Sequence, residues 1–265
     1  MDLHLAGKTA LVTASSSGIG LATATAIAAE GAIVVLNGRD GDRLKRAEEQ
    51  LRTRVPNASV RLVVADAGTE DGVRTITAAE PVADIVVNGV GAYGPAAFAD
   101  ITDHEWTRYW EVNVLSGVRL ARHYLPGMLE RDDDGRIVLV GTDAAVMVSS
   151  MMMHYEVTKT AVLALGRGLA DLTRGTSVTV NSVIPGPTAT EGMEGVLAGI
   201  ASDTGTSRED VVTGFFANGR PASLLQRLAT AEEVANLITY LVSPRAAATN
   251  GAAVRVEGGS IPTVL

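Results

Sequence analysis

Cysteine does not occur in this chain, and its absence excludes several kinds of site. Without thiols the protein cannot form disulfides, use a thiolate nucleophile or bind zinc through sulfur. No stretch of about 18 uncharged apolar residues is present, so we expect no membrane-spanning helix. The stretch Met1 to Lys8 contains Asp2 and lacks a basic segment followed by an apolar one, which argues against a secretory signal. A cytoplasmic location is the prediction.

A basic stripe is also missing, and the net charge is −8. The arginines and lysine between Arg43 and Arg54 share their segment with Asp42, Glu48 and Glu49, which is typical of a solvated amphipathic helix. We therefore expect no nucleic-acid partner and no membrane partner. The four histidines show no ligand-like spacing, so no metal site is predicted.

Apolar runs rich in β-formers alternate with helical patterns along the chain. The expected strands are 9–13, 33–36, 60–65, 85–88, 136–140, 178–183 and 253–256, and the expected helices are 18–30, 42–54, 70–79, 103–129, 152–173 and 231–242. This alternation predicts an α/β fold with a parallel sheet covered by helices on both faces. At 265 residues the chain is expected to form one dinucleotide-binding domain, 1–265.

The segment from Pro185 to about Arg227 does not fit the alternation, because it is rich in Gly, Thr and Ser. A long irregular insertion in a compact domain is often a lid or a binding loop, although a disordered surface loop is the alternative. Phe215 and Phe216 are two of only three phenylalanines, and large aromatic side chains favour the lid.

A serine- and glycine-rich turn, Thr13 to Gly20, separates the first expected strand from the first helix. Glycines at such a turn allow the backbone to approach a diphosphate, and the helix N-terminus supplies free N–H groups. A simple helix cap is the alternative. The next strand ends at Asn37-Gly38-Arg39, where an acidic residue would bind the ribose of NAD and an arginine the 2′-phosphate of NADP. Arg39 therefore favours NADP(H) over NAD(H), although Asp40 lies close and a solvent-facing turn is the other interpretation.

Tyr155 and Lys159 are four residues apart in a helical pattern, so their side chains share one face. A free tyrosine has a pKa of about 10, and a neighbouring ammonium together with an oxidised nicotinamide could lower it by several units. As a lone pattern this pair more often lies on the surface of a helix.

Taken together, these motifs make the chain resemble the short-chain dehydrogenase/reductase family along its whole length. The resemblance rests on the turn Thr13–Gly20, Asp66, Asn88-Gly89-Val90-Gly91, Asn113, Tyr155-Glu-Val-Thr-Lys159, Asn181-Ser-Val-Ile-Pro185-Gly186 and Glu257-Gly258-Gly259. It implies a Rossmann-type, doubly wound, seven-stranded parallel sheet in the order 3-2-1-4-5-6-7. It further implies a homo-oligomer, a tetramer or a dimer, that packs the helices carrying Asn113 and Tyr155 against partner copies.

The resemblance also implies the residues of the site. The catalytic residues would be Asn113, Thr142, Tyr155 and Lys159. The cofactor-binding residues would be Thr13, Ser15, Ser17, Gly18, Ile19, Gly20, Asn37, Arg39, Asp66, Ala67, Asn88, Gly89, Val90, Tyr155, Lys159, Pro185, Gly186, Thr188 and Thr190. Tyr155 would exchange a proton with the substrate oxygen, Thr142 would hydrogen-bond it, and Asn113 would hold a water that connects Lys159 to solvent.

Three positions depart from the family pattern. The first glycine of the turn is Ala14, which is tolerable if its φ is negative. The segment Asn88-Gly89-Val90-Gly91 keeps only its outer residues, and Thr142 stands where the family has serine. Threonine keeps the hydroxyl and adds a methyl that stiffens χ1. Ser149 and Ser150 would be candidates only if the alignment slipped, and they lie too close to Tyr155.

Several neighbours of Tyr155 have open roles. The residues proposed to form the walls of an apolar substrate pocket are Tyr93, Phe98, Met147, Val148, Met151, Met152, Met153, Phe215 and Phe216, with core packing as the alternative for the methionines. His154 and Glu156 are expected at the surface or an interface. Asp143 either faces a polar substrate or caps a turn.

The leading function is an NADP(H)-linked oxidoreductase that interconverts a carbonyl and a secondary alcohol, a ketone or a 3-oxoacyl thioester being the substrate. An NAD-dependent dehydrogenase of a cyclic, steroid or sugar alcohol is the first alternative. A nucleotide-sensing scaffold without turnover is the second, and it is disfavoured because every tetrad position keeps a group able to exchange or bond a proton.

Overall fold

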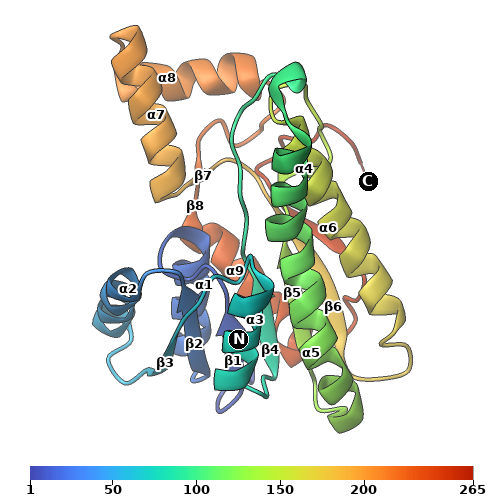
Figure 1. Ribbon diagram of the computed structural model, residues 1–265. Coiled ribbons are helices and arrows are strands. Elements are labelled where there is room, and N and C mark those ends of the chain that lie inside the picture. Colours follow the sequence, from blue (N-terminus) through green and yellow to red (C-terminus); the bar gives the residue numbers. More distant parts are fainter. Residues whose placement is uncertain (265) are drawn as a thin grey trace.

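Seven parallel strands form the central sheet, in the order β3-β2-β1-β4-β5-β6-β9 (Figure 1). The computed structural model describes residues 1–264. The strands are β1 (Thr9–Val12), β2 (Ile33–Gly38), β3 (Ser59–Val64), β4 (Ile85–Asn88), β5 (Arg136–Val140), β6 (Thr179–Pro185) and β9 (Ala253–Val256). The predicted order is confirmed. The seventh strand carries the label β9 because β7 (Thr188–Ala189) and β8 (Ala229–Thr230) pair as a separate small sheet.

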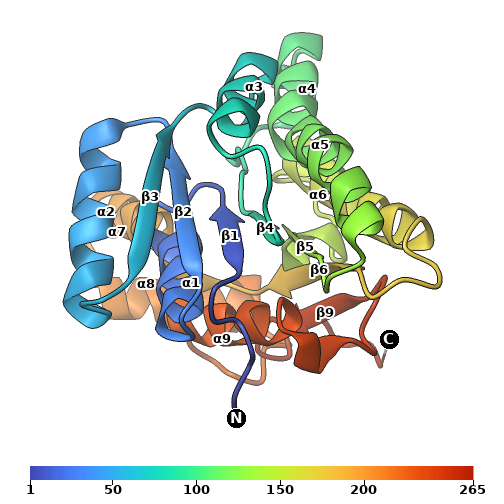
Figure 2. The same cartoon turned by 90° about the horizontal axis from the view of Figure 1, so that it is seen from below.

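Helices cover both faces of the sheet, as Figure 2 shows along the strand edges. Apolar side chains of α1 (Gly18–Ala29), α2 (Gly41–Arg54) and α9 (Ala231–Leu241) share one core with strands β1 and β2. Those of α3 (Glu70–Ala79), α5 (Ser116–Arg131) and α6 (Met153–Asp171) form the core on the other face. The central strands are apolar on both sides because both of these cores bury them.

The long helix predicted at 103–129 is interrupted in the middle. It consists of α4 (Asp103–Trp110), the π-helical segment η2 (Glu111–Leu115) and α5. A π-helical turn inside an α-helix often marks a functional position, and Asn113 lies at its centre. The segment thus brings an asparagine side chain toward the end of β4 without ending the helix.

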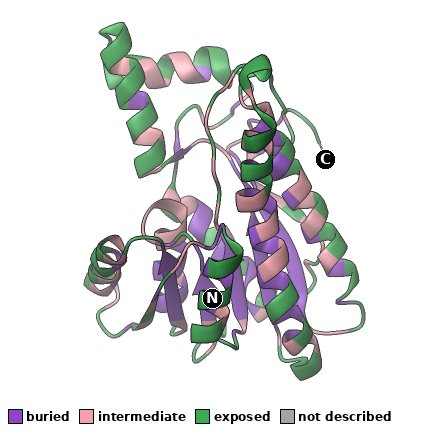
Figure 3. Ribbon diagram, in the orientation of Figure 1, coloured by how far each residue is buried: buried purple, intermediate pink, exposed green. Residues whose placement is uncertain are grey.

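The segment 185–227, expected to be irregular, is mostly helical. It contains α7 (Glu191–Thr204), α8 (Arg208–Gly214) and the π-helical η4 (Phe215–Gly219), which together we call the helical arm. The arm projects above the end of the sheet (Figure 1), on the side of α1 and α2 (Figure 2), and much of its surface is exposed (Figure 3). The prediction of irregular structure was wrong because Thr190 and Ser207 cap the two helices, while Gly192, Gly195 and Gly199 obscure the helical pattern.

Within residues 1–264, no helix combines the length and the apolar character that crossing a bilayer requires.

Candidate active site

The residues predicted as catalytic meet where the central strands end. Tyr155 and Lys159 lie in the first two turns of α6, Thr142 follows β5, and Asn113 comes from η2. The Thr142 hydroxyl lies near the phenol of Tyr155 and lowers its pKa, while Thr142 Oγ1 itself donates to Asp143 Oδ1 at 3.2 Å. The carboxyl ends of parallel strands meet at one edge of a sheet, which is the usual place for a ligand in such folds. The four predicted side chains are therefore gathered into one site.

Lys159 is buried and bound to the main chain of two strand ends. Its Nζ donates to the carbonyl oxygens of Val140 at 2.9 Å and Val90 at 3.2 Å. Burial lowers the pKa of the Lys159 ammonium to about 8, because the charged form loses its hydration. The two carbonyl oxygens leave one of its three N–H donors available for a ligand.

The acidity predicted for Tyr155 is not what the structure gives. Burial raises the pKa of Tyr155 to about 12, and the nearby Thr142 hydroxyl offsets this only in part. The carboxylates of Asp143 and Glu156 and the phenol of Tyr93 raise the pKa further. Lys159 does not lower this pKa as expected, because its ammonium donates to main-chain oxygens and desolvation disfavours the phenolate, whereas the effect expected of an oxidised nicotinamide stays a prediction.

Asn113 holds the start of α6 in place. Its Nδ2 donates to the Ala92 carbonyl and to the Thr158 hydroxyl, and its Oδ1 accepts from the Ala92 N–H at 2.7 Å. Thr158 in turn donates to the main-chain carbonyl of Tyr155. Both amide hydrogens of Asn113 are used, so only one accepting position on Oδ1 remains for a water. Asn113 thus braces the π-helical turn and orients the helix of Tyr155.

Asp143, next to Thr142, is buried and fully engaged. Its Oδ1 accepts from the Thr142 hydroxyl at 3.2 Å and from the Ala144 N–H at 2.8 Å. Its Oδ2 accepts from Arg220 Nε at 2.9 Å. The N-cap of η3 (Asp143–Ala145) is Thr142 and not Asp143, and the ion pair of Asp143 with Arg220 was not predicted. No sequence motif marks Arg220, which lies 77 positions away.

Four predicted cofactor residues form the floor below the glycine-rich turn. Thr13 donates to Asn88 Oδ1 at 2.9 Å, and Asn88 Nδ2 donates to Ser116. Ser15 Oγ donates to the Val12 carbonyl. The side-chain amide of Asn37 donates to the carbonyls of Val63, in β3, and Ala65, just after it. These side chains are all buried and bonded to one another or to the main chain, so they tie the turn to the strand ends around it.

The first turn of α1 carries the groups suited to a diphosphate. Ser17 is the N-cap and makes no side-chain capping bond, and the first turn contains no acidic residue. The N–H groups of Gly18, Ile19 and Gly20 therefore have no intrahelical partner and no capping side chain. Gly18 has φ +55°, and a Cβ there would lie 3.2 Å from the Thr190 methyl. Free N–H groups, a positive helix end and a glycine under close approach fit a dinucleotide phosphate.

Ala14 departs from the sequence expectation. It was predicted to be tolerable on the assumption of a negative φ, and its φ is +52°. A left-handed conformation is unfavourable for an L-residue with a Cβ, by roughly 1–2 kcal/mol. Alanine thus occupies a place where glycine would be relaxed.

The remaining predicted cofactor residues lie around this turn. Arg39 is exposed and Asp40 caps α2, accepting from the N–H groups of Asp42 and Arg43. Asp66 accepts from the Gly68 N–H, Ala67 is buried beside it, and Gly89 and Val90 follow β4.

Pro185 ends β6, and Thr188 donates to the Gly186 carbonyl. Thr190 caps α7 and shares a pocket with Gly18.

His154 and Glu156 are not surface residues. His154 is 2% exposed and packs on the ring of Tyr109, with a centroid distance of 4.0 Å. Glu156 is 3% exposed and accepts from the hydroxyl of Ser149 at 2.9 Å. The prediction failed because α4 covers one side of α6, which a single helical pattern does not reveal. Burial lowers the pKa of His154.

The proposed apolar wall is partly supported. Tyr93 lies 6.2 Å from the Tyr155 ring, between centroids, and is half exposed. Phe98, Val148 and Met151 are exposed too, and the Ala96 N–H donates to the Met151 carbonyl, joining the two loops that carry these side chains. Phe216 is 2% exposed and packs with Leu197 inside the helical arm, so its assignment to a pocket wall was wrong.

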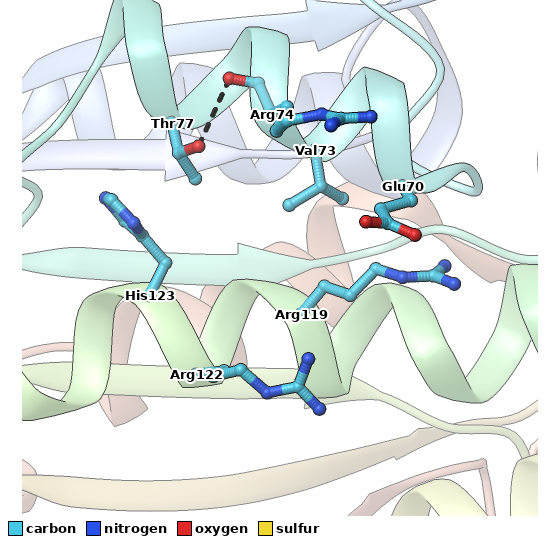
Figure 4. A pocket seen from close by; sticks show the side chains of 7 residues that line it. All are labelled: Glu70, Val73, Arg74, Thr77, Arg119, Arg122 and His123. Carbon is cyan, nitrogen blue, oxygen red and sulfur yellow. Dashed lines mark hydrogen bonds between the residues drawn. The ribbon is translucent and has the colours of Figure 1, made fainter.

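A separate pocket lies between α3 and α5 (Figure 4). Its lining residues are Glu70, Val73, Arg74, Thr77, Arg119, Arg122 and His123, and none of them belongs to the predicted site. Arg119 points from α5 toward Glu70 in Figure 4, and its Nη2 donates to Glu111.

Comparison with known proteins now identifies the family. The family model described as "Enoyl-(Acyl carrier protein) reductase" matches residues 13–260. The chain belongs to the short-chain dehydrogenase/reductase family. The uncharacterized oxidoreductase YvaG of Bacillus subtilis (strain 168) is 44% identical over 264 residues and covers 100% of both chains. A D-beta-hydroxybutyrate dehydrogenase of Cupriavidus necator is 31% identical over 96% of this chain and 98% of its own length.

Among solved structures, the L-sorbose reductase of Gluconobacter frateurii, complexed with NADPH and L-sorbose, is similar over 100% of both chains. Its TM-score is 0.92 and its sequence identity is 33%. As a short-chain dehydrogenase/reductase, this chain is an NAD(P)-dependent oxidoreductase that acts on CH–OH groups. The site residues described above are the positions at which its family chemistry is expected.

Proposed function

We propose that this protein is an NADP(H)-linked reductase that converts a ketone to a secondary alcohol, with Tyr155 as the proton donor. The observation that carries this proposal is the position of the Thr142 hydroxyl next to the half-buried Tyr155, which lies on α6 four residues before the buried Lys159. A hydroxyl and a phenol that meet in a desolvated site can both reach one carbonyl oxygen. Because its pKa is raised, the phenol holds its proton at neutral pH, as a donor must before reduction, but the same shift makes it a weaker acid.

Each group of the site has one task in this proposal. Thr142 orients the substrate oxygen, Tyr155 gives it a proton, and Lys159 returns that proton through its one unused donor. Asn113 keeps α6 in register through Thr158. The free N–H groups of α1 hold the diphosphate, and Asp66 and the 89–90 turn face the adenosine. When bound, the nicotinamide supplies the hydride to the carbonyl carbon.

Arg39 supports NADP(H) over NAD(H). It is exposed beyond β2, and within residues 1–264 no carboxylate is paired with it, so its guanidinium is available to a 2′-phosphate. Arg39→Gln is expected to weaken NADPH binding about tenfold and to leave NADH binding nearly unchanged. Arg174→Gln, at an exposed arginine that pairs with Asp171 just after α6, is the matched control. Equal weakening of both cofactors by Arg39→Gln would contradict the preference.

The substrate is proposed to be a ketone or a 3-oxoacyl thioester. The exposed apolar side chains of Tyr93, Phe98, Val148 and Met151 favour a substrate with an apolar part, and the helical arm is proposed to be its lid. A sugar ketose is the second candidate, favoured by the likeness to L-sorbose reductase and by the polar pair Asp143–Arg220 beside Thr142. A panel of acetoacetyl thioester, cyclohexanone and fructose, with both reduced cofactors, separates the candidates.

The decisive variant is Tyr155→Phe. It keeps the ring and removes the proton donor, so turnover with the best substrate of the panel should fall by about 10²–10⁴-fold. Binding of NADPH, followed by fluorescence, should persist. Tyr240→Phe, on α9, removes a phenol outside the site and should retain full turnover. Undiminished turnover in Tyr155→Phe would remove the phenol from the mechanism.

A homo-oligomer is also proposed, packed through the helices that carry Asn113 and Tyr155. Trp110 and Val157 are exposed apolar residues on α4 and α6, which supports an interface there. Light scattering of the purified protein tests this proposal, and a monomeric mass would contradict it.

A further inference from the structure

An ion pair joins the end of the helical arm to the residue next to Thr142. Arg220 follows the arm directly, as the C-cap of η4, and its N–H donates to the Phe215 carbonyl at 3.0 Å. Its guanidinium lies over the Phe215 ring, 5.9 Å from the centroid. Main-chain and ring contacts therefore fix Arg220 to the arm.

The partner of Arg220 is the residue next to the proposed substrate-binding hydroxyl. Arg220 Nε donates to Asp143 Oδ2 at 2.9 Å, and the side chains are 26% and 5% exposed. The other carboxylate oxygen of Asp143 accepts from the Thr142 hydroxyl and the Ala144 N–H. A continuous chain of bonds thus runs from the arm through Arg220 and Asp143 to Thr142, whose hydroxyl lies beside the phenol of Tyr155.

We propose that the Arg220–Asp143 ion pair is a latch that couples seating of the helical arm to the orientation of the Thr142 hydroxyl. Both residues act on the reaction through Thr142, so they are positioning residues. The role of Thr142 in this inference rests on the proposed function. A buried carboxylate with one charged partner is strongly affected when that partner is removed, so the pair is well suited to such coupling.

A change in the charge of the pair should shift the pKa of Tyr155, whereas loosening of the arm alone should not. Asp143, Glu156 and Tyr93 face Tyr155 and raise its pKa, Thr142 lowers it, and Lys159 lies on the same helix. Loss of Arg220 leaves the Asp143 carboxylate unneutralised and disfavours the phenolate. Loss of the Asp143 charge favours the phenolate. The two single variants should therefore shift the proton chemistry of Tyr155 in opposite directions.

The variants are Arg220→Gln, Asp143→Asn, the double variant and the conservative Arg220→Lys. The matched control is Arg208→Gln, which removes another arginine of the arm whose pair with Glu194 is 54% and 41% exposed. Arg220→Gln should lower kcat/KM about 10- to 100-fold through misplacement of Thr142, Arg220→Lys should recover much of it, and Arg208→Gln should cost little.

Hydrogen exchange of the purified protein tests the coupling without any substrate. Arg220→Gln should speed exchange at residues 144–146, and Asp143→Asn should speed it in the arm, residues 191–219. Arg208→Gln should affect the arm alone. This measurement needs no turnover, so it tests the latch even if the wild-type protein reduces no member of the panel. Absence of reduction would contradict the proposed function and not the latch. Effects confined to the segment that carries each substitution would overturn the latch.

The pH dependence of alcohol oxidation tests the link to Tyr155, with the alcohol chosen from cyclohexanol, 3-hydroxybutyrate and sorbitol by turnover. In this direction Tyr155 must lose its proton first, so activity rises with pH. Arg220→Gln should move that rise to higher pH, Asp143→Asn to lower pH, and the double variant should lie near the wild type. Shifts of the same sign in both single variants would overturn the coupling of the pair to Thr142 and Tyr155.

Discussion

The hydroxyl of Thr158 donates to the main-chain carbonyl of Tyr155 at 2.7 Å, and the same hydroxyl accepts from Asn113 Nδ2 at 2.9 Å. Thr158 is fully buried, and in the sequence it stands between Tyr155 and Lys159, the two residues of the family motif. One hydroxyl therefore joins the π-helical turn of η2 to the first turn of α6. The orientation of Tyr155 depends on this link as well as on its own helix.

Thr158→Val replaces this hydroxyl by a methyl of similar size. A buried Asn113 donor then loses its acceptor, so the free energy of unfolding should fall by about 1–3 kcal/mol. Turnover should fall about tenfold, because α6 is no longer tied to Asn113. Thr107→Val is the control, since its hydroxyl donates to the Asp103 carbonyl on the exposed side of α4. Urea unfolding and steady-state kinetics measure both effects, and equal losses in the two variants would contradict a special role for Thr158.

Ala14→Gly should stabilise the protein. The left-handed backbone at Ala14, with φ +52°, costs a Cβ-bearing residue roughly 1–2 kcal/mol, and glycine avoids this cost. Glycine loses more chain entropy on folding, about 0.5–1 kcal/mol, so a net gain of about 0.5–1 kcal/mol remains. The control is Ala78→Gly, an exposed position of α3, which should lose about 1 kcal/mol. A loss at Ala14 similar to that at Ala78 would show that the turn does not carry this strain.

The buried ammonium of Lys159 predicts a pH-dependent stability. Its pKa is lowered from 10.5 to about 8 by burial, so between these values the unfolded chain binds more protons than the folded one. Stability from this group therefore rises with pH across that window, by on the order of 1–3 kcal/mol. Comparison with Lys159→Met isolates the effect, because other groups cancel in the difference. A difference in unfolding free energy that stays constant from pH 7.5 to 10.5 would exclude the shift.

Much of the fold could be predicted because periodicity reports burial. The bounds of α3, β4, β5 and β9 agree with the prediction, since each is a regular apolar pattern between polar residues. The pattern could not show which neighbour covers a helix. His154 and Glu156 were therefore placed at the surface, whereas α4 and the loop of Ser149 bury them.

The residues of the candidate site were predicted from the sequence, but the contacts that link them to other parts of the chain were not. Asn113, Thr142, Tyr155 and Lys159 meet because motif residues follow successive strands, and parallel strands end together. The contribution of Lys159 to the Tyr155 pKa was predicted wrongly, because it depends on desolvation and on where the Lys159 ammonium points. Arg220 could not be found, because an ion pair across 77 positions leaves no periodic signal.

Gly192 is expected to be essential for seating the helical arm. A Cβ at this position would collide with the hydroxyl of Tyr93 but would lie 3.3 Å from the ring carbon behind it. Gly192→Ala should therefore displace the arm or Tyr93 and raise KM for the ketone several-fold, and Tyr93→Phe in the same chain should restore it by removing the colliding atom. Gly195→Ala, on the same helix with open space around it, is the control. A double variant as impaired as Gly192→Ala alone would mean that the arm does not rest on Tyr93.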